Sequence, residues 1–289
     1  MDKLTNKKHG RYMSLRISNM HIPSHIMLII YSMIVILPLY IMITGSFKGR
    51  LEIFRNAFGL PESLYLANYE HVLIGGNFLL YFRNSIVVVG LSLFFLLVLG
   101  IMIAYALASW KSKIANFLYF LFLAGMMIPL RMASIRLIEI VMALGLMGTF
   151  WGLIPTYVAM GLPIAVFVLT EFIRQIPKEL TEAAIIDGAG RFRVMLNIVV
   201  PLTRPALAAV AIYNLIPFWN DLWFPLIYIG AAREHNTLIL SVYELFFQYK
   251  TEWPRVLALL TLASLPVLTL YLLMSQQFIR GMTAGAVKE

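Results

Sequence analysis

The sequence predicts an all-α polytopic membrane protein. Hydrophobic residues make up 61% of the 289 residues and charged residues only 13%, about half of the ~25% charge typical of soluble domains. Apolar runs recur along the whole chain, and a helix of about 20 apolar residues crosses the ~30 Å hydrocarbon layer of a bilayer. The chain has no cysteine, which excludes disulfides and thiol chemistry. Its length predicts one membrane domain.

Six apolar stretches are expected to be transmembrane helices. They are Ile26–Ser46, Ile86–Ala108, Ile114–Leu130, Phe150–Ile173, Ala206–Ile229 and Arg255–Phe278. Several of them contain proline, which membrane helices tolerate because neighbouring groups satisfy the freed backbone. The more polar stretch Phe47–Asn77 is expected to hold short helices outside the membrane.

Charge asymmetry predicts the orientation. Basic residues dominate residues 1–25 and the connections after the second and fourth spans, whereas the opposite loops hold most of the acidic residues. Cytoplasmic loops carry an excess of Lys and Arg. Residues 1–25 are therefore expected to be a cytoplasmic tail, and residues 26–289 a transmembrane domain with both ends in the cytoplasm. The same rule explains the formal net charge of +9 without a nucleic-acid partner.

Residues 174–204 form a polar island between the fourth and fifth apolar stretches. Pro177 suits the start of a helix, where its missing N–H costs nothing. Leu180, Ala183 and Ala184 recur at the spacing of one helical face. The pattern predicts a short helix with one small, apolar side.

A turn and a second short helix are expected to follow. Gly188 is predicted to end the first helix with a positive φ, and the second helix is predicted to begin near Gly190, before Pro201 and Pro205. Its apolar face is expected to hold Phe192, Met195, Leu196 and Val199. The two helices would lie flat outside the bilayer, in a shape that fits a groove on another protein.

The same island resembles a known motif. Glu-Ala-Ala, three residues, Gly, nine residues and Ile-x-x-Pro is similar to the EAA loop of ABC importer permeases. The matching positions are Glu182, Ala183, Ala184, Asp187, Gly188, Ala189, Ile198 and Pro201. The preceding phrase Ile176–Leu180 resembles the carbohydrate branch, the maltose-type inner-membrane subunits. The resemblance covers most of the chain, with a core at about residues 70–280.

This resemblance implies the type I ABC importer permease fold, with six transmembrane helices and both termini inside. It implies that residues 174–204 are a coupling loop that docks into an ATPase subunit. The expected partners are a second related permease subunit, two ABC ATPase subunits, an extracytoplasmic substrate-binding protein and membrane lipid. The expected location is the bacterial cell (inner) membrane, and the expected substrate is a sugar or oligosaccharide.

The chain lacks the residues needed to hydrolyse ATP. It contains no Gly-x-x-x-x-Gly-Lys-Ser/Thr loop to hold phosphates, and its five His residues are scattered without the spacing of a metal site. We therefore expect a transport subunit that is not an enzyme and binds no cofactor of its own. ATP and Mg²⁺ would be used by the partner ATPase.

A second cluster, Phe218–Asp221, lies near the middle of the fifth apolar stretch. It combines aromatic faces with an amide and a carboxylate, a mixture that suits the C–H surfaces and hydroxyls of sugars. The alternative is a helix break at which Asn220 and Asp221 satisfy freed backbone groups. The candidate residues of a substrate path are Trp219, Asn220, Asp221, Asn214 and Tyr157.

Two other functions fit the sequence. The first is an ABC importer permease for a non-sugar solute, such as glycerol phosphate, which a binding assay across solutes would identify. The second is a secondary carrier that works without ATP. Such carriers typically place acidic residues deep in their spans, and Glu171 and Asp221 are the nearest candidates here.

Overall fold

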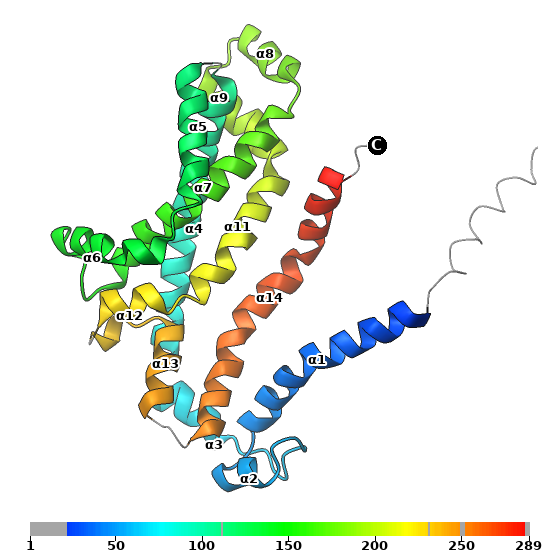
Figure 1. Cartoon of the computed structure of the whole chain (residues 1–289), viewed down its shortest axis with the longest axis vertical. Coiled ribbons are helices and arrows are strands. Elements are labelled where there is room, and N and C mark those ends of the chain that lie inside the picture. Colours follow the sequence, from blue (N-terminus) through cyan, green and yellow to red (C-terminus); the bar gives the residue numbers. More distant parts are fainter. Residues whose placement is uncertain (1–21, 111, 231, 249–251, 287–289) are drawn as a thin grey trace, which may run out of the picture.

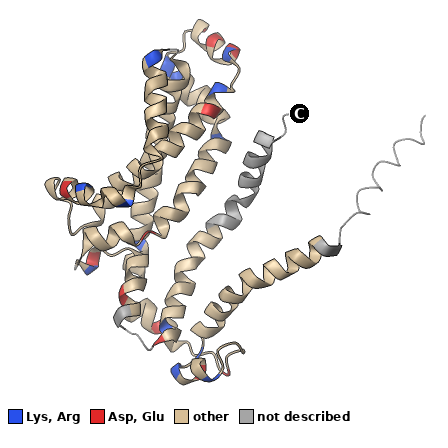
Figure 2. Ribbon diagram, viewed as in Figure 1, with Lys and Arg blue, Asp and Glu red and all other residues tan. Residues whose placement is uncertain are grey.

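The computed structural model describes residues 22–110, 112–230, 232–248 and 252–286, and within them the secondary structure is helical, without a strand. Long helices run side by side, and short helices lie at both ends (Figure 1). Figure 2 shows Lys, Arg, Asp and Glu mainly at these ends and on the short helices, while the middles of the long helices are almost free of charge. This distribution is typical of a chain that spans a hydrocarbon layer.

Helix α1 (Ile22–Ser46) stands apart from the other helices over most of its length (Figure 1). Its apolar side chains are exposed from Ile26 to Leu37, and it packs against α14 (Trp253–Ala286), where a Cβ on Gly45 would lie only 2.5 Å from a methyl carbon of Leu257. Exposed apolar surface on this scale requires lipid or another subunit to cover it. Of the expected tail, residues 1–25, the first 21 lie outside the described residues. The last four belong to helix α1, which begins at Ile22.

The centre of the molecule is a bundle of α4 (Phe78–Ser109), α5 (Lys113–Gly125), α7 (Leu153–Arg174) and α11 (Arg204–Trp219). Small residues bring α4 and α7 close together. A Cβ on Gly161 would lie 2.6 Å from Leu96, and a Cβ on Gly100 would lie 3.2 Å from the Cβ of Ala165. Close backbone approach through small residues is the usual way in which membrane helices pack.

The expected six uninterrupted spans are not confirmed. Among the described residues, three helices are long and apolar enough to cross a membrane, or up to five if each of two sharply bent helix pairs is one span. The prediction of a continuous third span, Ile114–Leu130, was wrong. Helix α5 ends at Gly125, and the chain turns by 89° into η2 (Leu130–Ala133) and α6 (Ser134–Ala143). Apolar composition alone does not reveal such a turn.

The fifth apolar stretch, expected as Ala206–Ile229, is also broken. It divides into α11, which ends at Trp219, and α12 (Trp223–Ile229). A second bend, of 74°, separates residues 191–202 from α11. The remaining expected spans lie within helices. Phe150–Ile173 coincides with η3 (Phe150–Gly152) and α7, and Arg255–Phe278 lies within α14.

Helix α4 begins at Phe78, eight residues before the expected Ile86. The polar residues Asn84 and Ser85 lie inside this helix and find partners on other elements, although Asn84 Oδ1 has no hydrogen-bond partner among the described residues. Asn84 Nδ2 donates to the carbonyl oxygens of Glu234 (2.9 Å) and Asn236 (3.0 Å), and Ser85 Oγ accepts from the N–H of Leu238 (2.8 Å). These bonds fix η5 (Arg233–His235) and α13 (Leu238–Gln248) against α4.

The connection after α1 contains short helices, as expected: α2 (Arg50–Arg55), α3 (Ala67–Glu70) and η1 (His71–Gly75). The side chain of Lys48 holds the first half of this connection in place through hydrogen bonds. The side chain is fully buried, and Nζ donates to the carbonyl oxygens of Asn56 (2.6 Å), Ala57 (3.2 Å) and Gly59 (2.7 Å). An ammonium group has three donors, so three carbonyls satisfy it completely.

The same connection is tied back to the end of α1. Asn68 Nδ2 donates to the carbonyl oxygens of Ser46 and Lys48, both at 2.9 Å, and the hydroxyls of Ser46 and Tyr69 are hydrogen-bonded at 2.7 Å. The end of the molecule opposite α8 (Lys178–Ile186) is therefore held by buried polar contacts rather than by apolar packing alone.

We expect Lys48→Met to lower the free energy of unfolding by about 3 kcal/mol, because three buried carbonyls lose a charged donor and remain unsatisfied. The measurement is the thermal midpoint of the purified protein in mild detergent. Arg55→Met is the matched control, because Arg55 is an exposed cation on the same connection. Equal midpoints for the two variants would refute the structural role of Lys48.

Candidate functional site

Helix α8 is closed by a complete C-terminal cap. The N–H of Gly188 bonds to the carbonyl oxygen of Ile185 (3.0 Å), and the N–H of Ala189 bonds to that of Ala184 (2.9 Å). This pair of bonds is the Schellman motif, in which the residue after the C-cap has a left-handed conformation. Gly188 has φ +84°, so the predicted positive φ is confirmed. At the other end, Pro177 is the N-cap residue.

No residue of α8 is buried. Ile186 is 85% exposed, and Leu180 and Ile185 are also exposed. The helix projects from one end of the bundle (Figure 1), and apolar side chains on its outer surface have no covering within the described chain. Exposed apolar surface of this kind is typical of a site that binds another protein or the membrane.

The segment after Gly190 differs from the predicted short helix. It consists of α9 (Arg191–Val194), the π-helical turn η4 (Met195–Val199) and α10 (Val200–Leu202). Of the predicted apolar face, Met195 and Val199 are buried, whereas Phe192 and Leu196 are exposed. The wider π turn changes which side chains share a face, so the prediction that all four form one apolar face was wrong.

The residues of the Glu-Ala-Ala motif are all exposed or half-buried. Glu182, Ala183, Asp187 and Gly188 are exposed on α8 and its cap, and Ala184 and Ala189 are half-buried. Ile198 is half-buried in η4, and Pro201 is exposed in α10. At the end of this segment, the Thr203 hydroxyl donates a hydrogen bond to the carbonyl oxygen of Val199 (2.8 Å).

Glu171, a candidate for a buried carrier acid, lies at the end of α7 near α8. Its side chain is 43% exposed, accepts a hydrogen bond from the Tyr119 hydroxyl (2.7 Å) and pairs with Arg174 (2.8 Å). The guanidinium of Arg174 also lies 4.7 Å from the centre of the Tyr119 ring. These contacts hold the ends of α5 and α7 together and leave Glu171 at the surface.

Tyr157 and Asp221, two residues of the predicted substrate path, meet within the bundle. The Tyr157 hydroxyl donates to Asp221 Oδ2 at 2.9 Å, and the Tyr157 ring stacks on Phe218 with centroids 4.9 Å apart. Asp221 also accepts from the N–H groups of Trp223 and Phe224, both at 3.2 Å. The carboxylate therefore satisfies the first free N–H groups of α12, which is the role expected at a helix break.

The other three residues of the predicted substrate path differ in their contacts. Trp219 is buried and donates from Nε1 to the carbonyl oxygen of Ala263 in α14 (3.3 Å). Asn214 is buried and donates to the carbonyl oxygen of Val210 (2.9 Å). Asn220 is exposed. A role of these residues in substrate passage stays a prediction.

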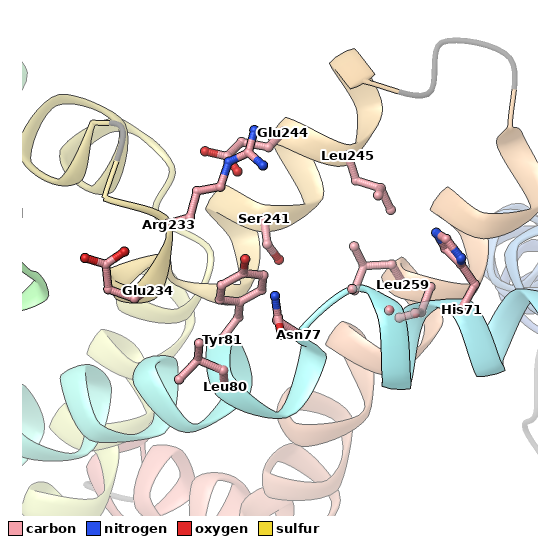
Figure 3. Close-up of a pocket in the computed structure, with 13 residues that line it drawn as sticks. His71, Asn77, Leu80, Tyr81, Arg233, Glu234, Ser241, Glu244, Leu245 and Leu259 are labelled. Atoms are coloured by element: carbon pink, nitrogen blue, oxygen red, sulfur yellow. The ribbon is translucent and has the colours of Figure 1, made fainter.

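A pocket of about 330 Å³ lies at the end opposite α8 (Figure 3). Asn77 and Tyr81 at the start of α4 point toward Ser241 of α13, with Arg233 and Glu244 beyond them. No sequence pattern links Asn77 and Tyr81 to the residues of α13, because more than 150 positions separate the two groups. The pocket therefore presents positively and negatively charged side chains together with uncharged hydrogen-bonding groups.

The chain is similar to known membrane transport proteins. Residues 96–284 match the model of the binding-protein-dependent transport system inner membrane component. The chain is 38% identical to a putative ABC transporter permease protein of Caldicellulosiruptor sp., which covers 91% of this chain and 95% of that protein. It is 33% identical to a diacetylchitobiose uptake system permease protein of Streptomyces coelicolor, with 92% and 88% covered.

A third relative is a probable starch degradation products transport system permease protein of Thermoanaerobacterium thermosulfurigenes, 34% identical, with 90% of this chain and 94% of that protein covered. The fold is similar to that of a chain in a solved bacterial ABC transporter that imports the acidic polysaccharide alginate. The TM-score is 0.66 at 16% identity, with 89% of this chain and 95% of that chain covered. At this identity the similarity shows the fold alone.

We expect Asp221→Ala to lower the free energy of unfolding by about 2 kcal/mol, because two N–H groups of α12 and the Tyr157 hydroxyl lose their acceptor. Asp221→Asn is the matched control. Asn keeps one acceptor oxygen, whereas Asp221 uses both, Oδ1 for Trp223 and Oδ2 for Phe224 and Tyr157, so its thermal midpoint in detergent should lie between those of the unchanged protein and Asp221→Ala. A midpoint for Asp221→Ala equal to that of Asp221→Asn would contradict the capping role.

Proposed function

Because the chain belongs to the family of binding-protein-dependent transport system inner membrane components, we propose that it is a permease subunit of an ATP-driven ABC importer for a sugar or oligosaccharide. The names of the relatives support the substrate class. Several relatives are named as uptake permeases for sugars, including those for diacetylchitobiose and for starch degradation products, and they align over about nine-tenths of this chain. The substrate would be delivered by an extracytoplasmic binding protein.

The α8 segment is proposed to be the contact with an ATPase subunit. Three features support this role: α8 has no buried residue, its apolar side chains are exposed, and a rigid cap joins it to the following segment. A helix that makes few contacts with its own bundle is free to bind another protein. Its movement would be transmitted through α7, which precedes it in the chain, and through α11, which follows the segment of α9, η4 and α10.

The complete importer is proposed to contain a second related permease and two ABC ATPase subunits. ATP and Mg²⁺ would bind to the ATPase subunits, and this chain would bind no cofactor and carry out no hydrolysis. The exposed apolar surface of α1 supports contact with lipid or the second permease. The chain would cross the bacterial cell (inner) membrane several times, with α8 on the cytoplasmic side and the pocket of Figure 3 on the side of the binding protein.

In this arrangement, ATP binding would draw the two ATPase subunits together and move α8 with them. The bundle would then change from inward to outward access as rigid bodies. Tyr157 and Asp221 join α7 to the α11–α12 break, so they lie where such a movement would have to pass between helices.

We expect Gly188→Asp to reduce sugar uptake at least tenfold while the protein still inserts into the membrane. A side chain at φ +84° costs about 1–2 kcal/mol, and a carboxylate would be placed on the surface proposed to meet the ATPase. The measurements are uptake of labelled sugar and the amount of protein in isolated membranes.

Gly145→Asp is the matched control for this variant. Gly145 ends α6 with φ +68° and the same two bonds that Gly188 makes at the end of α8, from its own N–H to Met142 and from the N–H of Leu146 to Val141. An Asp side chain at Gly145 has a similar conformational cost, but it lies at the end of α6 and not on α8. Normal uptake by Gly188→Asp, or equal loss in both variants, would be evidence against the docking role.

We expect Glu182→Lys to weaken attachment of the ATPase, because it reverses an exposed charge on the proposed contact surface. The measurement is the amount of ATPase that copurifies with a tagged form in mild detergent. Glu179→Lys makes the same charge reversal one turn earlier on α8. Unchanged copurification of Glu182→Lys, or an equal fall for both variants, would exclude a specific role of Glu182. Uptake that persists without any ATPase subunit would instead support a secondary carrier.

A further inference from the structure

We propose that the cavity between α8 and the bundle binds the phosphate headgroup of an anionic phospholipid. The cavity measures about 780 Å³ and is bounded by the ends of α4 and α7, the start of α5, helix α8 and the segment that follows it. The inference requires only that the chain lies in a membrane, and it is independent of the transported substrate.

Basic side chains from separate helices converge on this cavity. Lys113 comes from α5, Lys178 from α8 and Arg191 from α9, and none of the three has an ion pair or hydrogen bond within the described part of the chain. Arg174 also lines the cavity, although its charge is balanced by Glu171. Among the described residues that line the cavity, Glu182 is the only one with a carboxylate. With Arg174 paired to Glu171, the three cations Lys113, Lys178 and Arg191 against one carboxylate still leave an excess of positive charge.

The start of α5 adds to this positive potential. The N-terminal end of a helix carries a partial positive charge and favours anions, yet the first turn of α5 contains Lys113 and no acidic residue. Lys113 is therefore unfavourably placed unless an anion lies between it and the other cations. Ser109, Ser112 and Asn116 line the same part of the cavity and offer polar groups to phosphate oxygens.

The general excess of cations on the cytoplasmic side does not explain this arrangement. That excess requires basic residues near the membrane, but it does not require three helices to direct them into one space. Arg193 provides the contrast: it lies on α9 two residues from Arg191 and is exposed as Arg191 is, but it does not line the cavity.

The remaining lining identifies a lipid rather than a free ion. Trp110, 61% exposed, and Tyr105 lie at the end of α4, and such aromatic residues are enriched at the level of the headgroups. Leu107, Ile173 and Ile176 provide an apolar wall suited to the start of an acyl chain. Basic pockets between membrane helices on the cytoplasmic side characteristically bind phospholipid headgroups.

A lipid bound here would contact both α8 and the helices that end beneath it. It would stabilise the position in which α8 lies against the bundle, so lipid composition would influence how readily α8 moves. This effect would act on the segment proposed to contact the ATPase.

The test is lipid binding to the purified full-length chain and to the assembled importer, measured by native mass spectrometry during titration with phosphatidylglycerol or phosphatidylcholine of identical acyl chains. We expect retention of phosphatidylglycerol and not of phosphatidylcholine. Each of Lys113→Gln and Lys178→Gln should weaken binding about fivefold and the double variant about 25-fold. Arg193→Gln, the matched control, should leave binding unchanged. Thermal midpoints of all variants show that they are folded.

Three outcomes would overturn the proposal: equal retention of the two lipids, equal weakening by Arg193→Gln, or binding by the isolated chain that disappears in the assembled importer. Displacement of phosphatidylglycerol by millimolar inorganic phosphate would assign the cavity to a free anion and would also overturn it. If the unchanged protein binds no phosphatidylglycerol but the importer takes up sugar normally, this inference is refuted and the proposed function stands. If the unchanged protein binds phosphatidylglycerol but no sugar is taken up, the proposed function is refuted and this inference stands.

Discussion

A helix that breaks inside a hydrocarbon layer exposes N–H and C=O groups that no water can satisfy, and each such group costs several kcal/mol. The breaks in this chain are therefore possible only where side chains supply the missing partners. Asp221 accepts from two N–H groups at the start of α12 and from the Tyr157 hydroxyl. The paths of α11 and α12, and the cluster that lies between them, depend on these few bonds.

The two ends of the molecule are built in different ways. At one end, Lys48, Asn68 and Asn84 tie long connections to the helices through buried hydrogen bonds, which gives a surface that is already in place before a partner arrives. At the other end, α8 has no buried residue and is held mainly by its own cap. A fixed surface suits recognition of a delivered substrate, whereas a loosely attached helix suits the transmission of movement.

The central cluster shows how one contact can serve two purposes. Asp221 is needed to satisfy α12, and it also binds Tyr157 of α7 across the interface between helices. If α7 and α11 move relative to each other, this bond is one that changes. The bonds of Asp221 to α12 support the helix-break interpretation, and its role in the substrate path stays a prediction.

The sequence alone determined that the chain is helical and membrane-embedded, and it located the α8 segment and its Gly188 cap. These features depend on apolar run length and on local backbone preference, which neighbouring residues specify. Only the tertiary structure decided where the third and fifth apolar stretches break, that Lys48 is buried, and that Gly100 and Gly161 bring α4 and α7 together. In each case the partners lie on another helix or connection, and composition and periodicity carry no record of such contacts.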